Sequence, residues 1–94
     1  ELRKFAVALQ GGPKFAEIDQ VAILLASTNK KRRPPREFEV RVGPSDGFDD
    51  DTLIDCRWVR TVPKKMTDGC FQFRLPQDVM SDVSVALVAG LQMY

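Results

Sequence analysis

The chain has 94 residues, enough for one small domain with a single hydrophobic core. Its 14 basic and 13 acidic side chains give a formal net charge of +1, which excludes a global attraction to nucleic acid or to an anionic membrane. No apolar run approaches the roughly 20 residues of a membrane-spanning helix. The absence of histidine excludes nucleophile–histidine catalysis and disfavours a zinc site.

The first half of the sequence predicts three strands. Residues 2–9 alternate until a Gly-Gly-Pro turn stops them. Residues 21–26 form a continuous apolar run with β-branched side chains, which favours a central strand covered on both faces over the competing helix. In residues 38–43 apolar and charged side chains alternate, which indicates a strand with one buried and one exposed face.

The second half predicts further strands. Residues 53–62 form a long strand whose irregular alternation indicates a bulge or a change of face, and residues 70–75 alternate cleanly. Residues 83–91 begin with the same two-residue period, although they also fit helical spacing, and residues 77–81 are the other segment with a helical alternative. About seven short strands with turns between them predict one all-β domain over residues 1–94, a jelly-roll-like antiparallel sandwich or a barrel.

Two loops of opposite charge flank the strand at residues 38–43. The preceding loop is held extended by Pro34 and Pro35, and its candidate ligand-binding residues are Lys30, Lys31, Arg32, Arg33 and Arg36. The following loop is acidic, and we interpret it as a solvated loop because its spacing matches no EF-hand. We expect no metal site; the alternative is calcium or magnesium bound by Asp46, Asp49, Asp50 and Asp51.

For three further side chains the sequence leaves two interpretations open. Cys56 and Cys70 form either a disulfide, which would contribute on the order of 3 kcal/mol, or two reduced buried thiols. Trp58 is a candidate platform for stacking bases, but its position in the pattern favours the core.

The order of several segments carries a family resemblance. A strand at residues 5–9 with its Gly-Gly-Pro turn, the apolar residues 18–24, and a basic loop leading into residues 38–43 follow one another as they do in a discoidin-type domain of the fucolectin kind. Residues 83–87 resemble a late strand of that family. The resemblance implies a galactose-binding-like β-sandwich.

The same resemblance implies roles for individual residues. Cys56 and Cys70 fall where fucolectin-like members place a bridging pair, and Arg33 or Arg36 matches a sugar-contacting arginine. Family domains are longer, and their fucose-binding members use a histidine that this chain lacks. A partner chain or a second copy is therefore expected to complete the sandwich.

No group of residues forms a recognisable catalytic site, and no phosphate-binding loop or cofactor is expected. We therefore expect a non-enzymatic module that recognises glycans through its basic loop, as an oligomer or a partner-completed sheet. One alternative is an assembly subunit that joins copies or partner chains through β edges. Another is nucleic-acid binding by a basic sheet face. An extracellular or secreted location is expected, with cytoplasmic and virion locations open.

Overall fold

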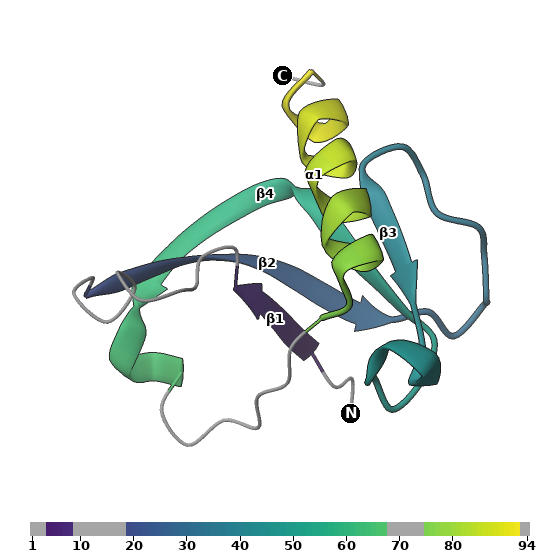
Figure 1. The fold of residues 1–94 in the computed structure, drawn as a ribbon, viewed down its shortest axis with the longest axis horizontal. Coiled ribbons are helices and arrows are strands. Elements are labelled where there is room, and N and C mark those ends of the chain that lie inside the picture. Colours follow the sequence, from purple (N-terminus) through teal and green to yellow (C-terminus); the bar gives the residue numbers. More distant parts are fainter. Residues whose placement is uncertain (1–3, 9–18, 68–74, 93–94) are drawn as a thin grey trace.

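The computed structural model describes residues 4–8, 19–67 and 75–92, which form one antiparallel sheet with a helix packed on it (Figure 1). The four strands have the order β1-β2-β4-β3, and each neighbouring pair is antiparallel. In chain order the described elements are β1 (Lys4–Ala8), β2 (Gln20–Thr28), β3 (Glu39–Val42), η2 (Pro44–Asp46), β4 (Thr52–Pro63), η3 (Lys64–Thr67) and α1 (Gln77–Leu91).

The strands of the first half agree with the sequence predictions. β2 lies between β1 and β4, and its residues Val21, Ile23, Leu24 and Ala26 are buried, although Leu25 of the same run is 37% exposed, so the predicted coverage of both faces is incomplete. β3 forms one edge of the sheet. The alternation predicted for it is confirmed, because Val40 and Val42 are buried while Arg41 is exposed.

The long strand β4 bulges in its middle. Ile23 pairs with Arg60 and Leu25 pairs with Asp55, so the single residue Leu24 faces residues 56–59 of β4. Extra residues on one strand bend it and turn its side chains in new directions. Figure 1 shows β4 as a long curved ribbon that pairs with β3 along one half only. The irregularity predicted for residues 53–62 is confirmed.

The helix α1 covers the face of the sheet formed by β3 and the first half of β4. Its buried residues Val79, Val83, Ala86 and Gly90 are three or four positions apart, which places them on one side of a helix. The core that α1 closes contains Leu24, Ala26, Val40, Val42, Phe48, Ile54, Cys56, Val79, Val83 and Ala86. No helix within the described ranges is long and apolar enough to cross a membrane.

The prediction of a seven-stranded sandwich is wrong. In the described part of the chain, a helix takes the place of a second sheet and covers the core. Residues 83–91 belong to α1, so the strand expected from their two-residue period is wrong. A strand would place Val83 and Val85 on the same face, but Val83 is 1% exposed and Val85 is 71% exposed, as on opposite sides of a helix. The next buried positions, Ala86 and Gly90, continue at helical spacing. The strand predicted for residues 70–75 lies, apart from Leu75, outside the described residues.

Candidate functional site

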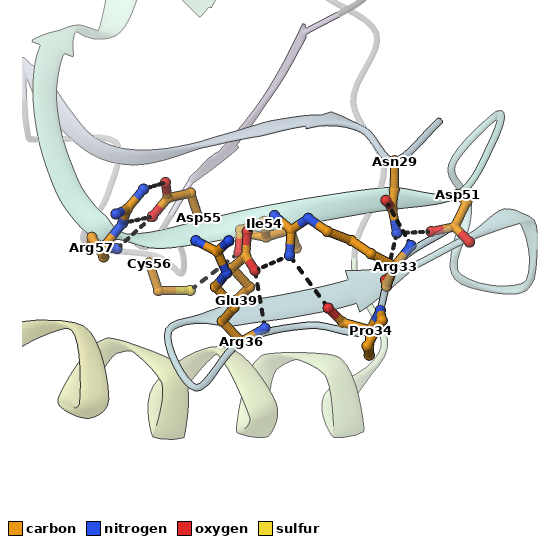
Figure 2. A network of polar contacts seen from close by, with 10 residues as sticks. All are labelled: Asn29, Arg33, Pro34, Arg36, Glu39, Asp51, Ile54, Asp55, Cys56 and Arg57. Carbon is orange, nitrogen blue, oxygen red and sulfur yellow. Dashed lines mark hydrogen bonds and ion pairs between the residues drawn. The ribbon is translucent and has the colours of Figure 1, made fainter. Parts of the chain in front are cut away.

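The basic loop that links β2 to β3 is organised by Asn29, which is 6% exposed. Its side-chain Nδ2 donates hydrogen bonds to the Arg33 carbonyl at 2.9 Å and to Asp51 Oδ1 at 3.1 Å, while its Oδ1 accepts from the Arg33 backbone N–H at 3.2 Å (Figure 2). Arg32 takes the left-handed conformation in the turn that these bonds close, with φ of 51°. Sequence reasoning did not single out Asn29; the tendency of asparagine side chains to bond nearby backbone was the available signal.

Arg33 fastens the loop to the edge strand. Its Nη1 and Nη2 each donate a 2.7 Å hydrogen bond to Glu39, and the Arg36 backbone N–H donates to Glu39 Oε1 at 3.0 Å. Figure 2 shows the Arg33 side chain reaching Glu39 on β3. The bonds from Arg33 lower the pKa of Glu39, and the same contact raises the pKa of Arg33. Arg33, one of the residues proposed to contact a ligand, therefore has its guanidinium engaged within the protein.

Several carboxylates of the acidic loop also accept hydrogen bonds from within the protein. Asp51 accepts three hydrogen bonds from Arg41, between 2.6 and 3.1 Å, and these lower the pKa of the Asp51 carboxyl. Asp46 accepts a bond from the Gly43 N–H at 3.1 Å, and Asp50 accepts one from the Asp51 N–H at 2.8 Å. Asp49 is exposed. Within the described ranges, no three such side chains come together to hold a metal ion, so the structure does not assemble the calcium or magnesium alternative.

Four cations of the loop remain directed to solvent. The side chains of Lys30, Lys31, Arg32 and Arg36 are exposed and donate no hydrogen bond to the described part of the protein. Asn29, Arg33 and Glu39 hold the backbone that carries them. The result is an ordered loop with a dense local positive charge on a molecule of nearly neutral net charge.

A second cationic group lies where the bulge of β4 meets the start of β3. Asp55 accepts bonds from Arg57 Nε at 3.2 Å and from Nη2 at 2.9 Å. Burial alone would raise the pKa of Asp55, but the bonds from Arg57 outweigh it and lower that pKa. The Arg57 guanidinium carbon lies 4.1 Å from the centre of the Phe38 ring and 5.8 Å from that of Trp58. Both distances are within cation–π range.

Trp58 does not lie in the core. It is 52% exposed, on the bulge of β4, so the core assignment made from sequence is wrong. The period-two pattern misplaced it because the bulge interrupts the alternation before residue 58.

Cys56 is a buried free thiol. Burial raises the pKa of Cys56 to about 11, so the thiol is protonated at neutral pH and is not a nucleophile there. The bridge to Cys70 involves a residue outside the described ranges.

Comparison with solved structures finds a similar fold in the Mycobacterium tuberculosis toxin MazF-mt6. The match has a TM-score of 0.74 and 16% sequence identity, and it covers 93% of this chain and 84% of the toxin chain. No protein-family model matches the sequence, and no curated protein matches it. The resemblance to discoidin-type domains is therefore wrong. At this identity the match establishes the architecture: the chain has a MazF-like fold.

Proposed function

We propose that this protein acts on RNA, as an endoribonuclease of the MazF toxin type. The observation that carries the proposal is the MazF-like fold over 93% of the chain. The same finding corrects the expectation of a non-enzymatic, glycan-binding module: the similar structure is a toxin, and nothing in the comparison supports a glycan partner. Of the earlier interpretations, nucleic-acid binding is the one that agrees with it.

The exposed basic loop supports RNA as the ligand. Lys30, Lys31, Arg32 and Arg36 present exposed positive charge and donate no side-chain hydrogen bond within the described part of the protein, and phosphates are the natural counterions for such a group. An arginine guanidinium also fits two oxygens of one phosphate, and it stabilises the negative charge that develops on phosphorus oxygens during cleavage. Because the net charge is only +1, binding must depend on this local patch.

The loop is also suited to hold RNA in a fixed orientation. Asn29 fixes its first turn, and the paired hydrogen bonds between Arg33 and Glu39 fix its second half. A loop that is ordered before binding loses less conformational entropy when the ligand arrives. This preorganisation favours a role in positioning the phosphate chain over a role in nonspecific attraction alone.

We also infer that the functional unit is a dimer, which the MazF-like fold favours. The side of α1 that faces away from the sheet carries three exposed apolar residues: Val85, Val88 and Leu91. Such side chains on the outer face of a helix are consistent with coverage by a second copy. Sedimentation measurements on the wild type and on Val88→Lys test this, and a monomeric wild type would contradict it.

The main test uses purified full-length chain and a labelled single-stranded RNA of mixed sequence. We expect cleavage on a denaturing gel and binding whose affinity falls with salt. For about four phosphate contacts, the slope of log K against log salt is about −3. The variant with Lys30→Gln, Lys31→Gln and Arg32→Gln should have a slope near −1 and little cleavage.

Lys65→Gln is the matched control, since it removes an exposed cation on η3 away from the loop. It should behave as the wild type does. A folded wild-type protein that neither binds nor cleaves RNA would contradict the proposed function.

A further inference from the structure

Trp58 is exposed at a place where the backbone has departed from regular pairing. It lies in residues 56–59, the four residues of β4 that face Leu24 alone, and its exposed fraction is 52%. Its neighbour Val59 is also 46% exposed. Bulges of this kind occur beside binding sites because they turn a side chain out of the sheet. A large aromatic ring held outward on an ordered strand can contact a ligand.

Arg57 gives this surface a second, rigid component. Two hydrogen bonds from its guanidinium and one from its backbone N–H, at 2.9 Å, go to the Asp55 carboxylate. The guanidinium thereby stays beside the Phe38 ring and within 5.8 Å of the Trp58 ring centre. Figure 2 shows Arg57 paired with Asp55 on the strand that runs past Glu39. The bulge therefore combines an exposed ring with a fixed cation.

The bulge surface adjoins the basic loop. The Cys56 N–H donates a 2.9 Å hydrogen bond to the Phe38 carbonyl, and Phe38 is only two residues beyond Arg36. The Arg57–Phe38 contact spans the same junction. A polynucleotide that places a phosphate on Arg36, at this end of the loop, would therefore pass the bulge with its next nucleotides.

We propose that Trp58 is a stacking platform for an unpaired base of single-stranded RNA, with Arg57 as the adjoining cation. This inference rests on the proposed action on RNA and adds the residue that contacts a base. An aromatic ring stacks on any base, but only on one that has left a duplex. The site therefore selects unpaired RNA, while the loop supplies affinity for the phosphates regardless of base pairing.

Trp58 is the only tryptophan in the chain, so its fluorescence reports on this one site. The test titrates the full chain with three probes of equal length: single-stranded RNA, the same ribose-phosphate chain without bases, and duplex RNA. We expect single-stranded RNA to quench the emission, and the probe without bases and the duplex to leave it nearly unchanged. Binding of each probe is followed independently by the anisotropy of a label on the nucleic acid.

Variants separate stacking from charge. Trp58→Ala should weaken binding of single-stranded RNA by about tenfold or more and leave binding of the probe without bases unchanged. Trp58→Phe keeps a ring and should recover most of the affinity. Val59→Ala is the matched control, because it shortens the neighbouring exposed side chain on the same bulge.

Three results would overturn the inference, and they differ in whether they also contradict the proposed action on RNA. RNA binding with unchanged Trp58 emission and full affinity in Trp58→Ala removes the stacking site but leaves the proposed action on RNA. A folded protein that binds no RNA removes both. Trp58 emission that shifts on dilution of the protein alone assigns the ring to an interface between two copies.

Discussion

At the scale of single residues, Asn29 determines the course of the basic loop. It is one of the two buried polar or charged residues among those whose burial the structure describes, and its amide is fully used by Arg33 and Asp51. A buried amide lowers the free energy of the fold only if each donor and acceptor finds a partner. Here the partners come from the loop itself and from Asp51, the residue just before β4, so one side chain joins two segments far apart in the sequence.

Asn29→Ala should therefore lower the free energy of unfolding by about 1–3 kcal/mol, because it leaves the Arg33 N–H and carbonyl without their partner. The midpoint of urea unfolding measures this loss. The variant should also bind RNA less tightly, since the loop cations lose their fixed placement. Ser45→Ala, at an exposed position in η2, is the control and should have the same midpoint of urea unfolding as the wild type. An Asn29→Ala protein of wild-type stability would show that the loop does not depend on this amide.

The contacts of the basic loop mark the limit of residue-level prediction. Sequence reasoning placed Lys30, Lys31, Arg32 and Arg36 on an exposed loop, because a run of charges beside Pro34 and Pro35 has few other options. The engagement of Arg33 depends on where β3 begins relative to the loop, and that of Asp51 depends on Asn29, 22 residues earlier. Both pairings depend on how the strands are arranged in the folded sheet, so they cannot be predicted from the local sequence.

At the scale of elements, strands were easier to predict than the helix. β3 alternates as a strand does, β2 was assigned over a competing helix from its short length and β-branched residues, and β4 was assigned despite an irregular alternation; each was expected within a few residues of its bounds. α1 was harder to predict, because Val83, Val85 and Leu87 are apolar at a two-residue period although Val83 is buried and Val85 is exposed. The sequence does not say which of these apolar side chains are buried, so a longer window is needed to separate a period of 2 from one of 3.6.

The packing of α1 against β4 depends on the absence of a side chain at Gly90. A Cβ there would lie 2.7 Å from the Cys56 carbonyl oxygen and 3.1 Å from the Arg57 Cα, both of which are backbone atoms. The helix end therefore rests directly on the bulge that carries Trp58. This contact links the position of the helix to that of the proposed stacking site.

Gly90→Ala should destabilise the protein although alanine favours a helix by about 1 kcal/mol over glycine. The added methyl group must push α1 away from β4, and the core between them loses contact. A lower midpoint of thermal unfolding, together with altered Trp58 fluorescence, is the expected result. Ser84→Ala on the exposed side of α1 serves as the control, because it introduces alanine into the same helix at an exposed position and removes only the 3.1 Å hydrogen bond to the Met80 carbonyl. A more stable Gly90→Ala protein would contradict the close approach.

At the scale of the whole molecule, one face of the sheet and its loops are held together by charge. Three arginine–carboxylate pairs lie there within the described residues: Arg33 with Glu39 joins the basic loop to β3, Arg41 with Asp51 joins β3 to the acidic loop, and Arg57 with Asp55 lies within β4. The opposite face is apolar and is closed by α1. The fold thus combines the apolar core beneath α1 with ion pairs on the other face, and the ionised carboxylates of those pairs make its stability depend on pH.

Acid should therefore weaken the fold. Arginine contacts hold the pKa values of Glu39, Asp51 and Asp55 below their usual range in the folded protein. Between about pH 5 and pH 3 the unfolded chain binds more protons than the folded chain, because its carboxyl groups have higher pKa values. The free energy of unfolding therefore falls as the pH falls. Thermal midpoints measured across this range at constant ionic strength should decline steadily.

Glu39→Gln identifies the source of that decline. Glutamine cannot ionise, so the variant should be less stable than the wild type at pH 7, and its midpoint should fall less steeply towards pH 3. Asp82→Asn is the matched control: it removes an exposed carboxylate on α1 that forms no ion pair in the described part of the chain, and it should keep the wild-type slope. If the midpoint of Glu39→Gln fell with pH as steeply as that of the wild type, the contact between Arg33 and Glu39 would not be the cause of the pH dependence. If the thermal midpoint falls less steeply with pH in Glu39→Gln but not in Asp82→Asn, the contact between the basic loop and β3 is the part of the fold that acid weakens. On lowering the pH, the wild type should then lose RNA binding before the core beneath α1 unfolds.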